Sequence, residues 1–147
     1  MKLTMKQITS GEDEVIIRYR EMNQQIETIA EIVREEGNRI NGFAEGKHFL
    51  LKPEEIYYFE SVDGVTYAYL KNMVCKVNES LEQLSIHYER RGMFRCSKSM
   101  VLNIYKIRHL KSEPGNRIRA TMENAEQVMI SRRYASILRQ ILKGERE

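Results

Sequence analysis

A short run of polar residues lies between apolar residues in the second half of the chain. Arginine and lysine side chains bind phosphates or guanine edges, and serine hydroxyls bind either. Strand alternation would turn Phe94 and Cys96 toward a core and place Lys98 at the bend that follows. The segment is therefore either a nucleic-acid contact or an exposed strand edge with ordinary solubilising charge. Its polar run consists of Arg95, Cys96, Ser97, Lys98 and Ser99.

A second candidate site is the triplet Ser131-Arg132-Arg133, at the start of a predicted helix. Two arginines in a first turn oppose the helix macrodipole, at a cost of about 0.3–1 kcal/mol for each exposed charge. The arrangement suits an anion, because free backbone N–H groups, the Ser131 hydroxyl and the arginines would converge on one phosphate. The alternative is an ion pair with a nearby carboxylate such as Glu126.

Catalytic chemistry has little support in the sequence. Glu60 and Asp63 are explained by a strand end and a turn, and no phosphate-cradling GxxxxGK[ST] or GxGxxG motif occurs. The histidines fall in separate predicted elements without the spacing of metal ligands. We therefore expect no enzyme activity, no cofactor and no metal site. The histidines are His48, His87 and His109.

Charge is unevenly distributed along the 147 residues, whose net charge is +3. Residues 1–50 carry 7 basic and 9 acidic side chains, whereas residues 90–119 carry nine basic side chains and a single acid, Glu113. Such a local field attracts polyanions, including nucleic acid. A solvated basic face without a partner is the alternative, to which charge alone gives about equal weight.

The two cysteines, Cys75 and Cys96, form no CxxC pair and suit a reducing compartment. No secretory signal and no 18-residue apolar run occurs, so we expect a cytoplasmic protein that does not insert into membranes. Oxidation of Cys96 could disturb the adjacent polar residues. Its core-facing position instead predicts a buried and unreactive thiol.

The opening residues predict a β-β-α leader over residues 1–45, with strands at 2–8 and 15–19 and a helix at 21–36. Gly37 is the expected stop of that helix. The apolar stripe of the helix could form a dimer contact. The stripe consists of Met22, Ile26, Ile29, Ala30 and Val33.

The rest of the chain, residues 46–147, is predicted to be mainly β. Asp63-Gly64 indicates a type I′ hairpin that pairs Phe59 with Ala68 and Tyr57 with Leu70. Asn78 is expected to cap one helix, which Gly92 ends, and Ser131 to cap the last. The expected strands are 40–43, 47–51, 56–61, 65–70, 75–77, 106–110, 117–122 and 127–130, and the expected helices are 79–89 and 132–143.

Several of these segments, in this order, resemble the LytTR DNA-binding domain family, from about Lys47 to Leu142. The resemblance implies an α+β fold, mainly β, of small packed sheets with a few helices. It also implies a bacterial-type transcription regulator that inserts loops into successive major grooves of a direct-repeat site, as a homodimer. The matching segments are residues 56–61, 80–84, 93–103, Ile107 and 130–134.

The resemblance also implies roles for individual residues. Lys98 and Arg133 match base-contacting positions, and Thr66 is the nearest match to a third. Arg95, Ser99 and Ser131 match positions that contact the DNA backbone. Many relatives carry His or Asn where this chain has Ser97-Lys98, and most follow a receiver domain, so the chain resembles the stand-alone type. The full set of expected DNA-binding residues is Thr66, Arg95, Ser97, Lys98, Ser99, Ser131, Arg132 and Arg133.

Two other functions fit parts of the sequence. A protein-interaction module could use the same basic face to bind an acidic partner. An RNA-binding surface could stack bases on Tyr67 and Tyr69, although side chains paired in a hairpin more often pack a sheet. Double-stranded DNA is the partner that the basic segments and the resemblance favour together.

Overall fold

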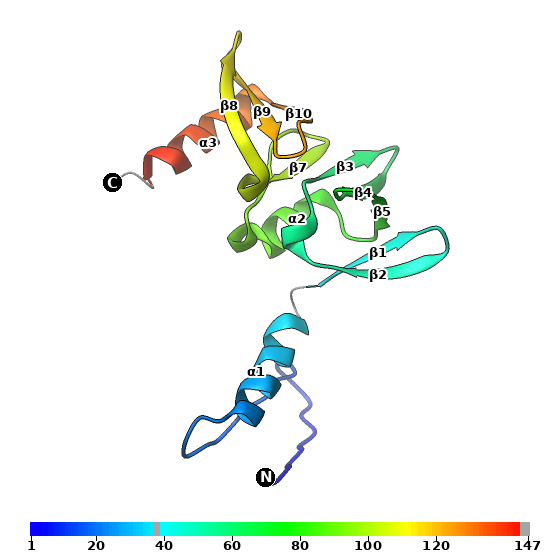
Figure 1. Cartoon of the computed structure of the whole chain (residues 1–147), viewed down its shortest axis with the longest axis vertical. Coiled ribbons are helices and arrows are strands. Elements are labelled where there is room, and N and C mark those ends of the chain that lie inside the picture. Colours follow the sequence, from blue (N-terminus) through cyan, green and yellow to red (C-terminus); the bar gives the residue numbers. More distant parts are fainter. Residues whose placement is uncertain (37–38, 145–147) are drawn as a thin grey trace. The chain divides into compact units, whose positions relative to one another are not determined.

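The computed structural model describes residues 1–36 and 39–144, and the chain forms two units, Met1–Gly37 and Asn38–Glu147 (Figure 1). The sequence-based boundary lay later, between residues 45 and 46. Strand β1 (Ile40–Ala44) belongs to the second unit, because it pairs with both β2 (Lys47–Leu51) and β5 (Val74–Val77).

The first unit contains a single described helix, α1 (Gln24–Glu36), and no strand in residues 1–22. The β-β-α prediction is therefore wrong in its two strands. A β-branched run such as residues 15–17 forms a strand only where a partner supplies ladder hydrogen bonds, and none does here. Asn23 caps α1, since its Oδ1 accepts a hydrogen bond from the Ile26 N–H at 3.0 Å. The expected stop at Gly37 lies outside the described residues.

The second unit is built on a seven-stranded antiparallel sheet (Figure 1). Neighbouring strands follow the order β2-β1-β5-β4-β3-β7-β6. The expected strand positions are confirmed with small shifts at their ends. The remaining strands of this sheet are β3 (Tyr58–Val62), β4 (Val65–Tyr69), β6 (Met93–Arg95) and β7 (Met100–Asn103).

The β3–β4 hairpin confirms the predicted turn, with φ of 51° at Asp63 and 79° at Gly64. Phe59 pairs with Ala68 as expected. The predicted pairing of Tyr57 with Leu70 is not part of the ladder, which ends at Tyr58 and Tyr69. Tyr57 lies between a 3-10 segment, Pro53–Glu55, and β3. Its side chain is buried in the second of the two hydrophobic cores described below.

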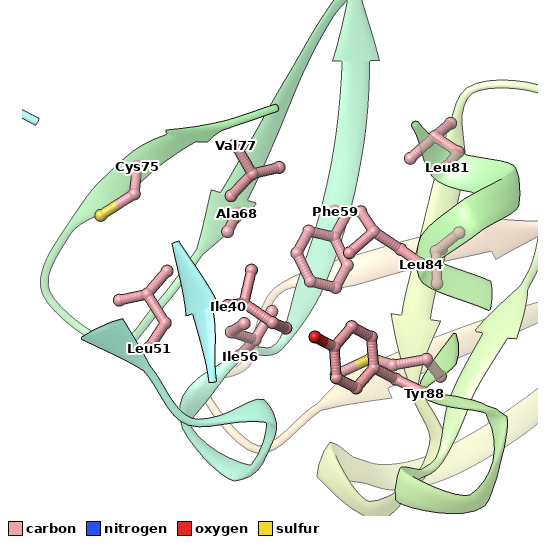
Figure 2. Packing of buried hydrophobic residues seen from close by; sticks show 12 residues of the cluster. Ile40, Leu51, Ile56, Phe59, Ala68, Cys75, Val77, Leu81, Leu84 and Tyr88 are labelled. Carbon is pink, nitrogen blue, oxygen red and sulfur yellow. The ribbon is translucent and has the colours of Figure 1, made fainter. Parts of the chain in front are cut away.

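Helix α2 (Leu81–His87) covers one face of this sheet and closes the first core, which Figure 2 shows around Phe59 and Leu84. Its cap is Ser80 rather than Asn78. The Ser80 Oγ accepts from the Gln83 N–H at 3.1 Å, and the Gln83 Oε1 accepts from the Ser80 N–H at 2.9 Å. This reciprocal capping box satisfies two N–H groups, which a cap at Asn78 would not.

A three-stranded antiparallel sheet and the last helix form the second core. The sheet contains β8 (Ile107–Glu113), β9 (Arg117–Met122) and β10 (Gln127–Ile130), and α3 (Arg132–Gly144) packs against β9. Ala135 and Leu138 of α3 are fully buried in this core. The mainly β fold with three helices agrees with the sequence-based expectation. No helix in the described part of the chain is long and apolar enough to span a membrane.

Candidate nucleic-acid interface

The predicted polar segment forms a hairpin loop between β6 and β7, residues 96–99, here called the 96–99 loop. The N–H groups of Cys96 and Ser97 both donate to the Met100 carbonyl, at 3.1 and 3.4 Å. The Ser99 N–H donates to the Ser97 Oγ at 3.2 Å. The Ser99 carbonyl accepts from the Ser61 N–H of β3 at 2.8 Å. The loop is therefore fixed at several points of its backbone.

The loop turns its side chains as strand alternation predicts. Phe94 and Cys96 are buried, Arg95 and Ser97 are half-buried, and Lys98 is exposed. Within the described residues, no carboxylate pairs with the Lys98 ammonium. Its charge is therefore available to a ligand outside the protein.

The start of α3 lies directly beside this loop. The Ser131 N–H donates to the Cys96 carbonyl at 2.9 Å, and the Ser131 carbonyl accepts from the Ala135 N–H at 2.8 Å. One residue thus links the loop to the first turn of the helix. The two segments with the predicted contact residues are far apart in sequence, and this hydrogen bond brings their backbones side by side.

Arg132 and Arg133 are exposed in the first turn of α3. The Arg133 guanidinium lies 5.5 Å from the centroid of the Tyr134 ring. The alternative of an ion pair with Glu126 is not found, and no other carboxylate in residues 1–36 or 39–144 pairs with either arginine. Glu126 instead lies beside Tyr58, where burial first and then this carboxylate raise the pKa of the phenol.

Sequence reasoning overlooked Arg117. Ile118 of β9 and Ile130 of β10 form the last pair of their ladder, and Arg117 and Ser131 directly adjoin this pair at the same end. The Arg117 side chain is exposed, and its Nε donates to the Pro114 carbonyl at 3.0 Å. The basic window around it was visible in the sequence, but only the strand register shows that Arg117 adjoins the α3 start.

Thr66 lies near the 96–99 loop, because it pairs with Ser61, whose N–H bonds the Ser99 carbonyl, but it is buried. Its side chain is 7% exposed, in β4, and lines a groove of about 580 Å³ that Lys98 and Arg95 also line. Glu79 and Glu82 lie along the same groove. The Thr66 hydroxyl therefore presents little surface to a ligand as large as a duplex.

The family model for the LytTr DNA-binding domain matches residues 46–143. The chain belongs to the LytTR DNA-binding domain family. A solved LytTr DNA-binding domain from Bacillus cereus superposes with a TM-score of 0.68, at 21% sequence identity over 71% of this chain and 96% of that chain. At that identity the likeness shows a shared fold. No curated protein matches the chain.

The LytTR domain keeps its Cys96 thiol out of solvent. Cys96 has no exposed surface, and burial raises the pKa of its thiol to about 12. At neutral pH the thiol is therefore protonated and a poor nucleophile. The expected burial of Cys96 is confirmed.

The LytTR domain shows no arrangement of ligands suited to a metal. Among the described residues, no group of three or more His, Cys, Asp or Glu side chains could hold an ion. His48 bonds Asn41 at 2.8 Å, and His87 lies 3.4 Å from Glu79. Both histidines thus have ordinary surface partners.

Proposed function

We propose that this LytTR protein is a transcription regulator that binds double-stranded DNA in a sequence-specific way. It reads major grooves through loops. The observation that carries this proposal is the Ser131–Cys96 hydrogen bond, at 2.9 Å, which brings two basic segments of a DNA-binding domain side by side. Arginine and lysine side chains without protein partners on one surface suit a polyanion.

Within this surface, we assign base contacts to Lys98 and Arg133. Both are exposed, and lysine or arginine can donate to the O6 and N7 of guanine. Contacts to the sugar-phosphate backbone are assigned to Ser97, Ser99, Ser131 and Arg132. The last two lie where free N–H groups at the start of α3 favour a phosphate. Thr66 is at most a marginal contact, because little of its side chain is exposed.

We further propose that the regulator binds a direct-repeat site as a homodimer. Each unit considered by itself supports this. The second unit carries the DNA-binding surface, and the first exposes apolar side chains of α1, with Ile29 36% and Val33 38% exposed. Exposed apolar stripes on helices commonly mark contacts between proteins.

Selection from a library of random duplexes tests this function directly. We expect enrichment of a motif, and weaker binding of the enriched duplex by Lys98→Ala and by Arg133→Ala. Each substitution should cost about 1–3 kcal/mol of specific binding free energy, as for one lost base contact. The free energy of unfolding should change little, since both side chains are exposed.

Two results would contradict the proposal. A module that binds an acidic protein would enrich no motif from the library. Wild-type affinity of both substituted proteins for an enriched duplex would show that the base contacts lie elsewhere.

A further inference from the structure

Arg95 lies at the base of the 96–99 loop, and its guanidinium points back into it. Its Nε donates to the Ser97 carbonyl at 2.7 Å and its Nη2 to the Lys98 carbonyl at 2.6 Å. Both are short hydrogen bonds from a charged donor, which are about twice as strong as neutral ones. One side chain thus binds two successive carbonyls of the loop.

These two carbonyls have no other donor in the described chain. Ser97 and Lys98 lie between β6 and β7, outside the ladder whose last pair is Arg95 with Val101. The other hydrogen bonds of the loop reach its Cys96 and Ser99 carbonyls, its N–H groups or the Ser97 hydroxyl, and not the carbonyls of Ser97 and Lys98. The loop is fixed at its other points by backbone hydrogen bonds, and its Ser97 and Lys98 carbonyls are bonded by this one guanidinium.

Its two hydrogen bonds to carbonyls distinguish Arg95 from the other arginines of the surface. Arg132 and Arg133 are exposed and bond no carbonyl of the described residues, whereas Arg95 is half-buried and bidentate. A phosphate contact would have to use the donors that remain or break these bonds. A loop already held in its bound shape loses less conformational entropy when it binds.

We propose that Arg95 is a positioning residue, which fixes the 96–99 loop so that Lys98 is presented to a base, and that it is not a phosphate contact. This departs from the backbone contact that the resemblance implies for Arg95. It rests on the proposed function, because the role of Arg95 is exerted through Lys98.

The first test needs no DNA. In Arg95→Ala and Arg95→Lys, amide hydrogen exchange of residues 97–99 should become faster than in the wild type, because the bidentate bond is lost in both. Arg108→Ala is the matched control, since Arg108 also donates to one backbone carbonyl, that of Glu123 at 2.8 Å. Unchanged exchange in both Arg95 variants would overturn the proposal.

The second test is a titration of an enriched duplex and of an unrelated duplex at several salt concentrations. If Arg95 is a positioning residue, its substitution by alanine should weaken specific binding on the order of tenfold. Binding of the unrelated duplex and the slope of log K against log salt should stay unchanged. Lysine at this position should not restore specific binding. If Arg95 is instead a phosphate contact, its substitution by alanine would lower the slope by about 0.9 and weaken binding of both duplexes, and lysine at this position would largely restore binding. That result would overturn the proposal.

A double-mutant cycle with Lys98→Ala completes the test. Arg95→Ala should cost little further affinity once Lys98 is absent, whereas additive losses would contradict action through Lys98. The two proposals fail in different ways. If Lys98→Ala itself binds like the wild type, the assigned reading surface is wrong. If Lys98→Ala weakens binding and Arg95→Ala behaves as a phosphate contact, only the positioning role is wrong.

Discussion

At the scale of single residues, the interface combines basic side chains that bond other groups of the protein with basic side chains that pair with no carboxylate of the described residues. Arg95 and Arg119 have protein partners, the latter in an ion pair with Glu113 at 3.0 Å. Lys98, Arg132 and Arg133 have no carboxylate partner in the part of the chain that the structure describes. The free charges gather where the 96–99 loop meets α3, which is why these residues carry the functional proposal.

Arg117 should extend this surface as a phosphate contact. Arg117 is exposed and, like Ser131, adjoins the last β9–β10 pair, and its one hydrogen bond to the described residues leaves donors of the guanidinium available. We expect Arg117→Ala to weaken the enriched and the unrelated duplex alike and to lower the salt slope by about 0.9. Anisotropy titrations across salt concentrations measure both effects.

Arg108→Ala again serves as the control for loss of one positive charge from β8 and β9. Arg108 lies at the opposite end of β8 from the turn that precedes Arg117. If Arg117→Ala changes the slope no more than Arg108→Ala, Arg117 contributes only to the general field.

At the scale of elements, the stability of a short helix depends on the hydrogen bonds at its ends. Helix α2 has only seven residues, so the Ser80 capping box satisfies a large share of its free N–H groups. Leu81 and Leu84 of this helix are buried against the sheet that carries the 96–99 loop. The stability of α2 is thus part of what holds the loop in place.

Ser80→Ala should lower the free energy of unfolding by about 0.5–2 kcal/mol. Urea unfolding should show a lower midpoint with an unchanged slope. Ser85→Ala is the matched control, because the Ser85 hydroxyl only bonds the Glu82 carbonyl within the same helix and alanine favours helix. Equal midpoints for the two variants would contradict the importance of the cap.

At the scale of the whole molecule, the two units have different surfaces. The second unit buries two apolar cores beneath its sheets. The first leaves most of its large apolar side chains exposed, although Ile26 of α1 is buried. A unit with so much exposed apolar surface commonly binds another protein, and a homodimer would place two DNA-binding domains on one direct-repeat site.

Substitution of the α1 stripe tests the dimer in the full-length protein. Ile29→Glu combined with Val33→Glu should reduce the mass measured by light scattering from that of a dimer to that of a monomer. Burying a carboxylate in an apolar contact is strongly unfavourable. Thr28→Glu, at an exposed position on another side of α1, should leave the mass unchanged. A wild-type protein that is monomeric at all concentrations would contradict the homodimer.

The sequence by itself determined most elements of the second unit, because their information is local. Asp63-Gly64 specified a hairpin through the positive φ that its turn requires, and alternation placed Phe94 and Cys96 in the core. Local patterns gave wrong predictions where a strand or a cap depends on a second group to bond it. The leader strands had none, and Ser80 proved a better cap than Asn78 because Gln83 could complete the box.

Only the tertiary structure decided how the basic segments combine. The polar run at 95–99 and the triplet at 131–133 each had an ordinary alternative while they were considered separately. Two contacts join residues from different segments, namely the Ser131–Cys96 hydrogen bond and the β9–β10 pairing beside Arg117. A third, the bidentate bond of Arg95, joins a side chain to carbonyls of its own loop. Such contacts depend on how strands pair and pack, which no periodicity within a single segment encodes.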